Sequence, residues 1–362
     1  MILQRSLATC CAIVALAMPA VGSSAGEAGT WSAAASMSTA RYHPTATSLL
    51  DGRVLIVGGE GNSSLDSTAE LYSASSGTWA TGGTLNEPRT LHVAVRLADG
   101  RVLVAGGFYS ATAELYDPAT NSWTPTGSMK VGRISFTGTQ LADGRVLVVG
   151  GNSFNGLQAS AEIYDPKTGI WTSTGSLKIA RRNHTATLLS NGSVLVAGGA
   201  GSGSKNAYPR DAELFNPKTG RWGRAGSMTT GREAPSATRL ADGRVLVAGG
   251  GNPNGLAGSS AELYNPASGS WSATGSMNAP HGRTAVLLQD GRVLVADNGV
   301  GDVYSPATGT WTETGPMVFP YASAAAALLT NGRALYAGGA KVKFCGQYSC
   351  DEPVADAELY TP

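Results

Sequence analysis

Runs of apolar residues recur along the chain at regular distances, and each follows an Asp-Gly or Asn-Gly pair. In the fourth occurrence, polar and apolar residues alternate over 184–189, Asn191-Gly192 follows, and residues 194–197 are entirely apolar. Alternation is typical of a half-buried strand, and Asn-Gly favours a tight hairpin turn. A run of four apolar residues is too short for a helix but suits a strand covered on both faces. The pattern therefore predicts a hairpin with a buried second strand.

The rest of the repeat predicts two more strands. Gly198-Gly199 ends the apolar run, Glu213-Leu-Phe215 forms a third strand that stops at Asn216-Pro217, and Trp222 lies on a fourth. Seven such units occur, and their Asp/Asn-Gly pairs begin at Asp51, Asp99, Asp143, Asn191, Asp242, Asp290 and Asn331. Their tryptophans are Trp31, Trp79, Trp123, Trp171, Trp222, Trp271 and Trp311. Successive tryptophans lie 40 to 51 residues apart, a spacing typical of β-propeller blades.

The number of tryptophans also predicts how the ring closes. Trp31 precedes the first Asp-Gly pair, whereas the last unit ends at Tyr360-Thr361-Pro362 without a tryptophan. Seven tryptophans serve seven blades only if the strand around Trp31 completes the last blade. Pairing of the two ends removes an open sheet edge. We therefore predict an all-β fold, a seven-bladed β-propeller closed by an N-terminal strand.

The combination of Gly-Gly after the second strand and Trp on the fourth resembles the kelch repeat. The resemblance covers about residues 31–362. Propellers commonly bind ligands at one mouth of the central channel, where the loops between strands two and three meet the connections from strand four to the next strand one. In kelch propellers the start of strand one commonly supplies contacts. The resemblance therefore implies a ligand site on that face.

Composition excludes several kinds of partner. The formal net charge is +1, charged residues make up 14% of the chain, and no basic run occurs. Such a chain lacks the electrostatic footprint of a nucleic-acid or anionic-membrane binder. We expect a monomer with no nucleic-acid partner and no membrane insertion.

The first residues resemble a secretory signal. Arg5 precedes an apolar stretch over 7–20, and Ser23-Ser24-Ala25 fits a small-residue cleavage site, with residues 20–22 as an alternative. The stretch is short for a membrane anchor. Thr9-Cys10 matches a lipoprotein box poorly. We predict a signal peptide over 1–25, a single propeller domain over 26–362, and a secreted or periplasmic protein.

Two cysteines remain after the predicted leader. Cys345 and Cys350 lie in one loop, and in an exported chain a disulfide is the expected state. A metal site is the alternative, but the nearest histidine in the sequence, His281, precedes Cys345 by 64 residues. We predict the disulfide.

The loops between strands two and three differ in length. The loop of the fourth unit spans 200–211 and that of the seventh spans 340–356, whereas the sixth unit has almost none after Asp297. A long loop beside a missing one predicts a pocket at the sixth and seventh blades.

An arginine stands ten residues before the Asp/Asn-Gly pair in five units: Arg41, Arg89, Arg133, Arg181 and Arg232. One hypothesis is a ring of guanidinium groups that binds an anion at the mouth. The other is that each arginine binds local carbonyls or the recurring glutamate of its own blade. The glutamates are Glu70, Glu114, Glu162, Glu213, Glu262 and Glu358. Recurrence in step with the repeat favours the structural role.

Residues that vary around this arginine are the better ligand-binding candidates. All four histidines of the chain fall among them. The candidates are His43, His92, Phe136, Asn183, His184, Glu233, His281, Arg283 and Tyr321.

Two families of enzymes carry a similar pattern. The segment 41–47 and the cysteine loop resemble the propeller of galactose oxidase and glyoxal oxidase, which bind copper through two tyrosines and two histidines. Here the propeller tyrosine of that set falls at about His43, and the Tyr-His pair falls at about Ala322-Ser323. No cysteine remains for the thioether cross-link. The copper ligand set is therefore not expected, and we predict no metal and no cofactor.

The second is the kelch sialic-acid mutarotase, which uses acid-base residues. Glu233, His184 and His281 could transfer protons in this way, but no paired carboxylates specific to that enzyme occur. We therefore predict a binding or scaffold module for a glycan or a protein, without assigned catalytic residues. An enzyme acting on a small sugar or sugar acid is the alternative.

Overall fold

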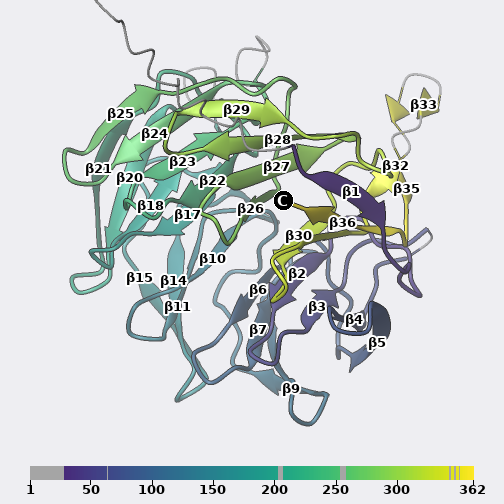
Figure 1. The fold of residues 1–362 in the computed structure, drawn as a ribbon. Coiled ribbons are helices and arrows are strands. Elements are labelled where there is room, and N and C mark those ends of the chain that lie inside the picture. Colours follow the sequence, from purple (N-terminus) through teal and green to yellow (C-terminus); the bar gives the residue numbers. More distant parts are fainter. Residues whose placement is uncertain are drawn as a thin grey trace, which may run out of the picture.

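Seven four-stranded antiparallel sheets surround a central axis (Figure 1). The structure, a computed structural model, describes residues 28–62, 64–202, 207–252, 258–341 and 351–362, with the backbone alone of 344–345 and 348–349. The predicted signal peptide and the side chains of Cys345 and Cys350 lie outside the described residues, so export and the disulfide remain predictions. In the described part of the chain, no helix is long and apolar enough to cross a membrane.

Blades one to four follow the same strand order. Blade one is β2 (Thr45–Ser48), β3 (Val54–Val57), β4 (Thr68–Ser73) and β5 (Thr78–Thr84). Blade two is β6 (Val93–Arg96), β7 (Val102–Ala105), β8 (Ala113–Asp117) and β9 (Ser122–Thr126). Blade three is β10 (Thr137–Gln140), β11 (Val146–Val149), β14 (Ala161–Asp165) and β15 (Ile170–Thr174). Blade four is β17 (Thr185–Leu188), β18 (Val194–Ala197), β20 (Asp211–Asn216) and β21 (Arg221–Ser227).

The ring continues through blades five to seven. Blade five is β22 (Ser236–Arg239), β23 (Val245–Ala248), β24 (Ala261–Asn265) and β25 (Ser270–Ala273). Blade six is β26 (Ala285–Leu287), β27 (Val293–Asp297), β28 (Val300–Ser305) and β29 (Thr310–Glu313). Blade seven is β30 (Ala325–Leu328), β31 (Ala334–Ala337), β36 (Ala357–Thr361) and β1 (Thr30–Ala33).

Short two-stranded pairs extend some of the loops. They are β12 (Asn152–Ser153) with β13 (Gly156–Leu157), β16 (Arg181–Arg182) with β19 (Ala200–Gly201), β32 (Ala340–Lys341) with β35 (Glu352–Pro353), and β33 (Phe344–Cys345) with β34 (Tyr348–Ser349).

The N-terminal strand closes the ring, as the sequence predicts. β1 pairs with β36 in antiparallel register, with Trp31 opposite Tyr360 (Figure 1). The indole N–H of Trp31 donates to Oγ1 of Thr314 in blade six at 3.0 Å. The two ends of the chain therefore share one sheet, and no blade is left with a missing fourth strand.

Neighbouring blades hold together through apolar contacts and the tryptophans. The four apolar residues of the second strand are buried in every blade, and Leu55 and Val57 of blade one pack with Val102 and Val104 of blade two. Each indole also reaches the preceding blade. Trp123, for example, donates its N–H to the Gly82 carbonyl at 2.8 Å. A buried indole needs such a partner, so the position selects Trp for its size and its N–H group.

Gly-Gly pairs are required where neighbouring blades converge. Gly58 has a φ of 59°, and a Cβ there would lie 2.4 Å from the carbonyl oxygen of Arg89 in blade two. The next residue, Gly59, donates its N–H to that same oxygen at 2.8 Å. A side chain would both clash and disfavour the left-handed backbone, which explains the recurrence of the pair.

Candidate functional site

The five recurring arginines are buried parts of the blades. The side chain of Arg133 is fully buried, and its Nη1 donates to the carbonyls of Gly150 and Ser160 at 2.9 and 3.0 Å. Its Nη2 lies 2.9 Å from Oε1 of Glu162. Arg41, Arg89, Arg181 and Arg232 make the corresponding contacts to the glutamate and carbonyls of their own blades. The five arginines therefore bind the carbonyls and the glutamate of their own blades. They do not form a ring of guanidinium groups at the mouth.

Blade six keeps this ion pair with different residues. His281 takes the place of the arginine, because its carbonyl accepts the N–H of Gly250 just as the Arg89 carbonyl accepts that of Gly59. Its Nε2 lies 2.8 Å from Oδ2 of Asp302, and both side chains are buried. A shorter basic side chain thus meets a shorter carboxylate.

Blade seven has no cation at this position among the described residues. Tyr321 replaces the arginine, and its hydroxyl donates to Oδ2 of Asp356 at 2.7 Å. Glu358 is buried and accepts the backbone N–H of Val318 at 2.8 Å, with no basic side chain of the described residues within ion-pair distance. Burial raises the pKa of the Glu358 carboxyl to about 7.

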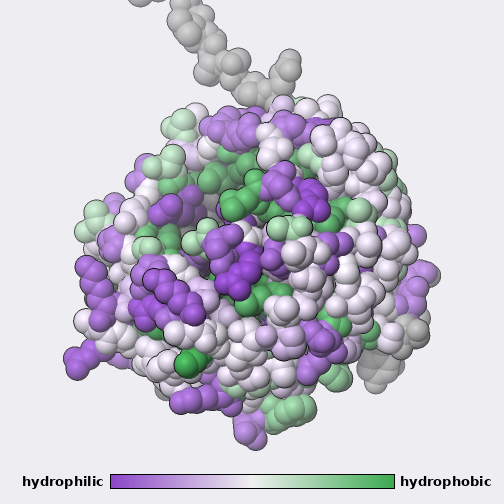
Figure 2. Space-filling model, turned by 90° about the horizontal axis from the view of Figure 1, so that it is seen from below, coloured by the Kyte–Doolittle hydropathy of each residue, from purple (hydrophilic) through white to green (hydrophobic). Residues whose placement is uncertain are grey.

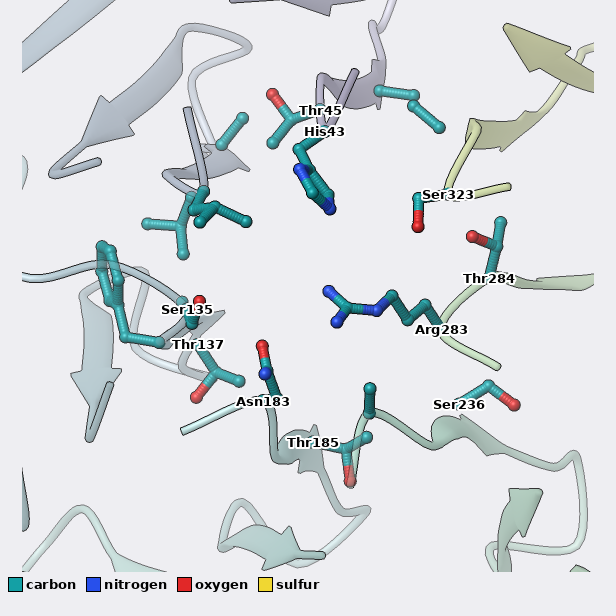
Figure 3. Close-up of a pocket in the computed structure, with 18 of the residues that line it drawn as sticks. His43, Thr45, Ser135, Thr137, Asn183, Thr185, Ser236, Arg283, Thr284 and Ser323 are labelled. Atoms are coloured by element: carbon teal, nitrogen blue, oxygen red, sulfur yellow. The ribbon is translucent and has the colours of Figure 1, made fainter. Parts of the chain in front are cut away.

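The mouth of the channel is formed by the residue two positions after each arginine or its substitute. In all seven blades this residue has a left-handed backbone, with φ between 29° and 56°. The seven are His43, Leu91, Ser135, Asn183, Ala234, Arg283 and Ser323, and all of them line a central cavity of about 530 Å³. His43, Ser135, Asn183, Arg283 and Ser323 are labelled around the open centre in Figure 3.

Backbone hydrogen bonds hold this strained ring in place. The N–H of Ser135 donates to the Leu91 carbonyl at 3.1 Å, and Asn183 donates to Ser135 in the same way at 2.9 Å. Ala234 and Arg283 continue the series at 2.9 and 3.0 Å. A left-handed conformation costs roughly 1–2 kcal/mol for a residue with a Cβ. The backbone N–H of each of these residues is bonded to the mouth residue of the preceding blade. These bonds fix the backbone from which each side chain projects.

The wall beneath the mouth is made of small residues. The first strands of neighbouring blades contact one another around the axis, and two successive positions of most of them line the cavity. The first of the two is Thr or Ser in most blades, and the second is Ala or Gly in all seven. The seven residues are Ala46, Ala94, Gly138, Ala186, Ala237, Ala285 and Ala326. The side chains at the mouth therefore differ from blade to blade, whereas these seven wall positions carry no side chain that can form a hydrogen bond.

Arg283 is the cation of the mouth. Its side chain is exposed and its guanidinium group points to the centre of the cavity (Figure 3). Among the described residues, no carboxylate oxygen lies within 4.0 Å of it. Asp297, whose pKa burial raises, interacts with its charge and accepts the Ser323 N–H at 3.2 Å. Arg283 lies one residue closer to its Asp-Gly turn than the equivalent residue does in the other blades. Its φ of 29° is also lower than that of the other six mouth residues.

His43 and Asn183 add further hydrogen-bonding groups to the mouth. The His43 ring stacks on that of Tyr42, with centroids 3.7 Å apart, and its Nδ1 lies 3.8 Å from Oε1 of Glu60. Asn183 donates from Nδ2 to Oε1 of Glu233 at 2.7 Å, and its amide oxygen faces the cavity (Figure 3). Glu233 thereby orients Asn183 from outside the cavity.

His92, Phe136 and His184 line the cavity but act as spacers between blades. Each ring packs against the first glycine of the preceding blade's Gly-Gly pair. His92 and His184 bond through Nε2 to the hydroxyls of Thr45 and Thr137, each at 3.0 Å. Burial lowers the pKa of both histidines to about 3, so both are neutral near pH 7.

The nine sequence candidates thus occupy different places. His43, Asn183 and Arg283 lie at the mouth, and His92, Phe136 and His184 lie in its wall. Glu233, His281 and Tyr321 are not among the residues that line the cavity, because they support the mouth or fill the arginine position. Sequence reasoning missed Leu91, Ser135, Ala234 and Ser323. The constant spacing of two residues from the arginine could have found them.

The cavity of about 530 Å³ lies on the axis, and the pocket that loop lengths predict at blades six and seven stays a prediction. Between those blades, the described residues enclose a cavity of about 10 Å³ lined by Tyr321, Tyr336 and Glu358. The two-residue loop of blade six, Asn298-Gly299, confirms how short that connection is. Much of the neighbouring blade-seven loop lies outside the described residues.

The mouth does not fit copper. Cu(II) prefers nitrogen and oxygen ligands in a tetragonal arrangement. His43 is the mouth's imidazole, Ser323 stands where a ligand histidine would be needed, and the Ser323 N–H bonds to Asp297. Over the described ranges, no group of three His, Cys, Asp or Glu residues could hold a metal ion.

The hydropathy of the surface agrees with the low overall charge. On the face drawn in Figure 2, hydrophilic and apolar residues are interspersed. In the strand 2–3 loops of blades two and three, the rings of Tyr109 and Phe154 stack with centroids 4.6 Å apart, and Phe154 is 83% exposed.

Comparison with known proteins supports the fold. The kelch motif matches residues 89–130 and 135–178. Among solved structures, a fungal alcohol oxidase of the AA5 family, in complex with copper, is similar with a TM-score of 0.74 and 22% identity. The similarity covers 92% of this chain and 76% of that one. A search of curated proteins finds no match to this sequence.

Proposed function

Because the chain is a seven-bladed kelch-repeat β-propeller whose described residues leave Arg283 unpaired at the channel mouth, we propose that it is a binding module for an acidic glycan. The glycan enters on the face where the strand 2–3 loops meet the strand 4–1 connections, and its carboxylate binds Arg283. Binding of a protein ligand is the alternative outcome of the test.

The guanidinium group of Arg283 carries this proposal. It is exposed, lies within the cavity, and has its donors free of carboxylate partners among the described residues (Figure 3). A guanidinium group binds a carboxylate through two parallel hydrogen bonds, which gives direction as well as energy. The five buried arginines of the repeat cannot serve, because their donors are bound within their own blades.

The groups around Arg283 suit a sugar. Hydroxyl and amide side chains surround the guanidinium group, among them Ser135, Asn183 and Ser323 (Figure 3). They can bond to sugar hydroxyls, since each can both donate and accept. The exposed ring of Phe154, in the strand 2–3 loop of blade three, offers a flat apolar surface for a further sugar ring. Export, which the leader predicts, would place such a module where free glycans occur.

Binding is favoured over acid-base catalysis by the state of the histidines. His184 is buried with its pKa lowered to about 3, and His281 is engaged by Asp302. A general base is most effective when its pKa is near the working pH and when it reaches the substrate. Neither histidine meets both conditions.

The test is a glycan array followed by measurement of affinity and turnover. We expect uronic or sialic acid glycans to bind the wild type, and Arg283→Gln to weaken that binding about 10- to 100-fold, because a charge-assisted hydrogen bond contributes about 1.5–3 kcal/mol. Arg101→Gln, which removes a half-buried arginine from a strand 1–2 turn on the opposite face, is the matched control and should bind normally. Conversion of the glycan by the wild type would contradict the proposal of a non-catalytic module.

A further inference from the structure

The arginine position of each regular blade is a built cation site. In blade one, Nη1 of Arg41 donates to the carbonyls of Gly58 and Thr68 at 3.0 and 2.9 Å, and Nη2 lies 3.2 Å from Oε1 of Glu70. Asp66 adds a second carboxylate in blade one, so the part that recurs in the other blades is two backbone carbonyls and one glutamate around a single positive group. Blades two to five repeat the arrangement, and blade six places His281 against Asp302.

Blade seven keeps the acceptors and loses the cation. The corresponding groups are the carbonyls of Gly338 and Asp356 and the carboxylate of Glu358, and all three residues line the cavity of about 10 Å³. Tyr321 does not replace the arginine's donors, because its hydroxyl bonds to the side chain of Asp356. Lys341 lies over the Tyr321 ring, 5.5 Å from its centroid, and forms no ion pair with Glu358 among the described residues.

A second observation points to a missing occupant. Tyr336 lies directly opposite Glu358 on the neighbouring strand, at a position that is Ile or Val in blades one to six. Its side chain is 2% exposed and lines the same cavity, and its hydroxyl has no hydrogen-bond partner among the described residues. A buried hydroxyl without a hydrogen-bond partner destabilises the folded state, so the Tyr336 oxygen is available to bind a ligand in the cavity.

We propose that this cavity binds a sodium-sized monovalent cation, which replaces the missing arginine of blade seven. All of its ligands are oxygen atoms, and such sites select hard cations. Two carboxylates line the cavity, and that of Asp356 already accepts the Tyr321 hydroxyl. A single positive charge beside Glu358 would therefore take the place that the guanidinium group has in the other blades. The volume corresponds to about one water molecule, which suits one small ion.

The site lies in the blade that closes the ring. Glu358 belongs to β36, which pairs with the N-terminal strand β1 on one side and with β31 on the other. Because the cation would bind only the folded arrangement of these strands, it should stabilise the folded protein increasingly as its concentration rises.

The experiment is thermal unfolding of the whole protein in sodium, potassium, calcium or N-methylglucamine chloride at equal ionic strength and mildly alkaline pH. We expect sodium to raise the Tm of the wild type by about 2 °C or more over N-methylglucamine. Tyr321→Arg should restore the internal cation of the regular blades, so its Tm should not respond to sodium. Glu358→Gln should also lose the response, and Asp143→Asn, a surface carboxylate, should keep it.

Three results would overturn the proposal. An equal wild-type Tm in sodium and N-methylglucamine would mean that a water molecule fills the cavity. An equal response in wild type and Glu358→Gln would mean that sodium acts elsewhere, and this comparison holds even if Tyr321→Arg fails to fold. A response to calcium alone would contradict a monovalent site.

Discussion

The arginine and glutamate positions of the repeat carry the same ion pair in blades one to five but different residues in blades six and seven. In the first five, a buried arginine, a glutamate and two carbonyls form one repeated unit. Blade six replaces the pair with His281 and Asp302, and blade seven leaves Glu358 without a basic partner among the described residues. The mouth's exposed cation, Arg283, also belongs to blade six. Repetition therefore identifies the residues that build the ring, and departures from it identify candidate sites.

The difference also separates buried from accessible charge. Arg133 occupies the arginine position of its blade, and Arg283 occupies the position two residues later in blade six. Arg133 is fully buried, whereas Arg283 is exposed in the cavity. An arginine bound to its own blade has no donors left for a ligand. Residue type alone does not distinguish the two, whereas the position within the repeat does.

The largest effect is expected from breaking a regular arginine-glutamate unit. Arg133→Ala should leave Glu162 buried without its partner and lower the free energy of unfolding by about 3–5 kcal/mol. Tyr321→Ala in blade seven should cost less, because it removes no member of an ion pair. Denaturant unfolding measures both. Equal losses would show that the regular and the irregular positions contribute alike.

Acid should destabilise the protein through the two buried histidines. His92 and His184 have folded-state pKa values of about 3, below the ordinary value of 6.5 that an unfolded chain would show. Below pH 6.5 the unfolded state therefore binds more protons than the folded state, and stability falls as the pH falls. The loss approaches about 1.4 kcal/mol per pH unit for each histidine until the folded pKa is reached.

A variant that copies blade three tests this expectation. Phe136 occupies the position of these histidines and packs against Gly106 in the same way. The double variant His92→Phe, His184→Phe should therefore lose much of the decline in unfolding free energy between neutral pH and pH 4. An unchanged pH dependence would contradict the assignment of neutral histidines.

The smallest effect concerns backbone strain at the mouth. Ala234 has a φ of 54°, so Ala234→Gly should leave stability unchanged or raise it by less than about 1 kcal/mol. Ala237→Gly, three residues later on β22, should lower stability by about 0.5–1 kcal/mol because strand geometry gives glycine no advantage. If both variants were destabilised equally, the left-handed mouth ring would not hold in solution.

The fold could be predicted from the sequence because the repeat carries it. The Asp/Asn-Gly turns, the buried second strands and the unmatched Trp31 led to seven blades and to closure by the N-terminal strand, and the structure has both. These features follow from the residues of each turn and from the number of tryptophans and Asp/Asn-Gly pairs. A single sequence provides both.

The candidate site could be predicted only in part. Arg283, His43 and Asn183 were found because they interrupt the repeat, but Leu91 and Ala234 were missed because ordinary apolar residues give no signal of a left-handed backbone. The placement of Tyr336 against Glu358 depends on cross-strand register, and the sequence pattern alone did not single out this tyrosine. Burial of His184 likewise depends on contact with a neighbouring blade.

The central claim is that Arg283, and not the repeated arginines, binds the carboxylate of the ligand. Isothermal titration of the wild type and Arg283→Gln with one acidic oligosaccharide and its carboxyl-reduced form tests it most directly. The account predicts that only the wild type binds the acidic form tightly, and that neither protein binds the reduced form. Equal binding of both forms by the wild type, or undiminished binding of the acidic form by Arg283→Gln, would contradict it.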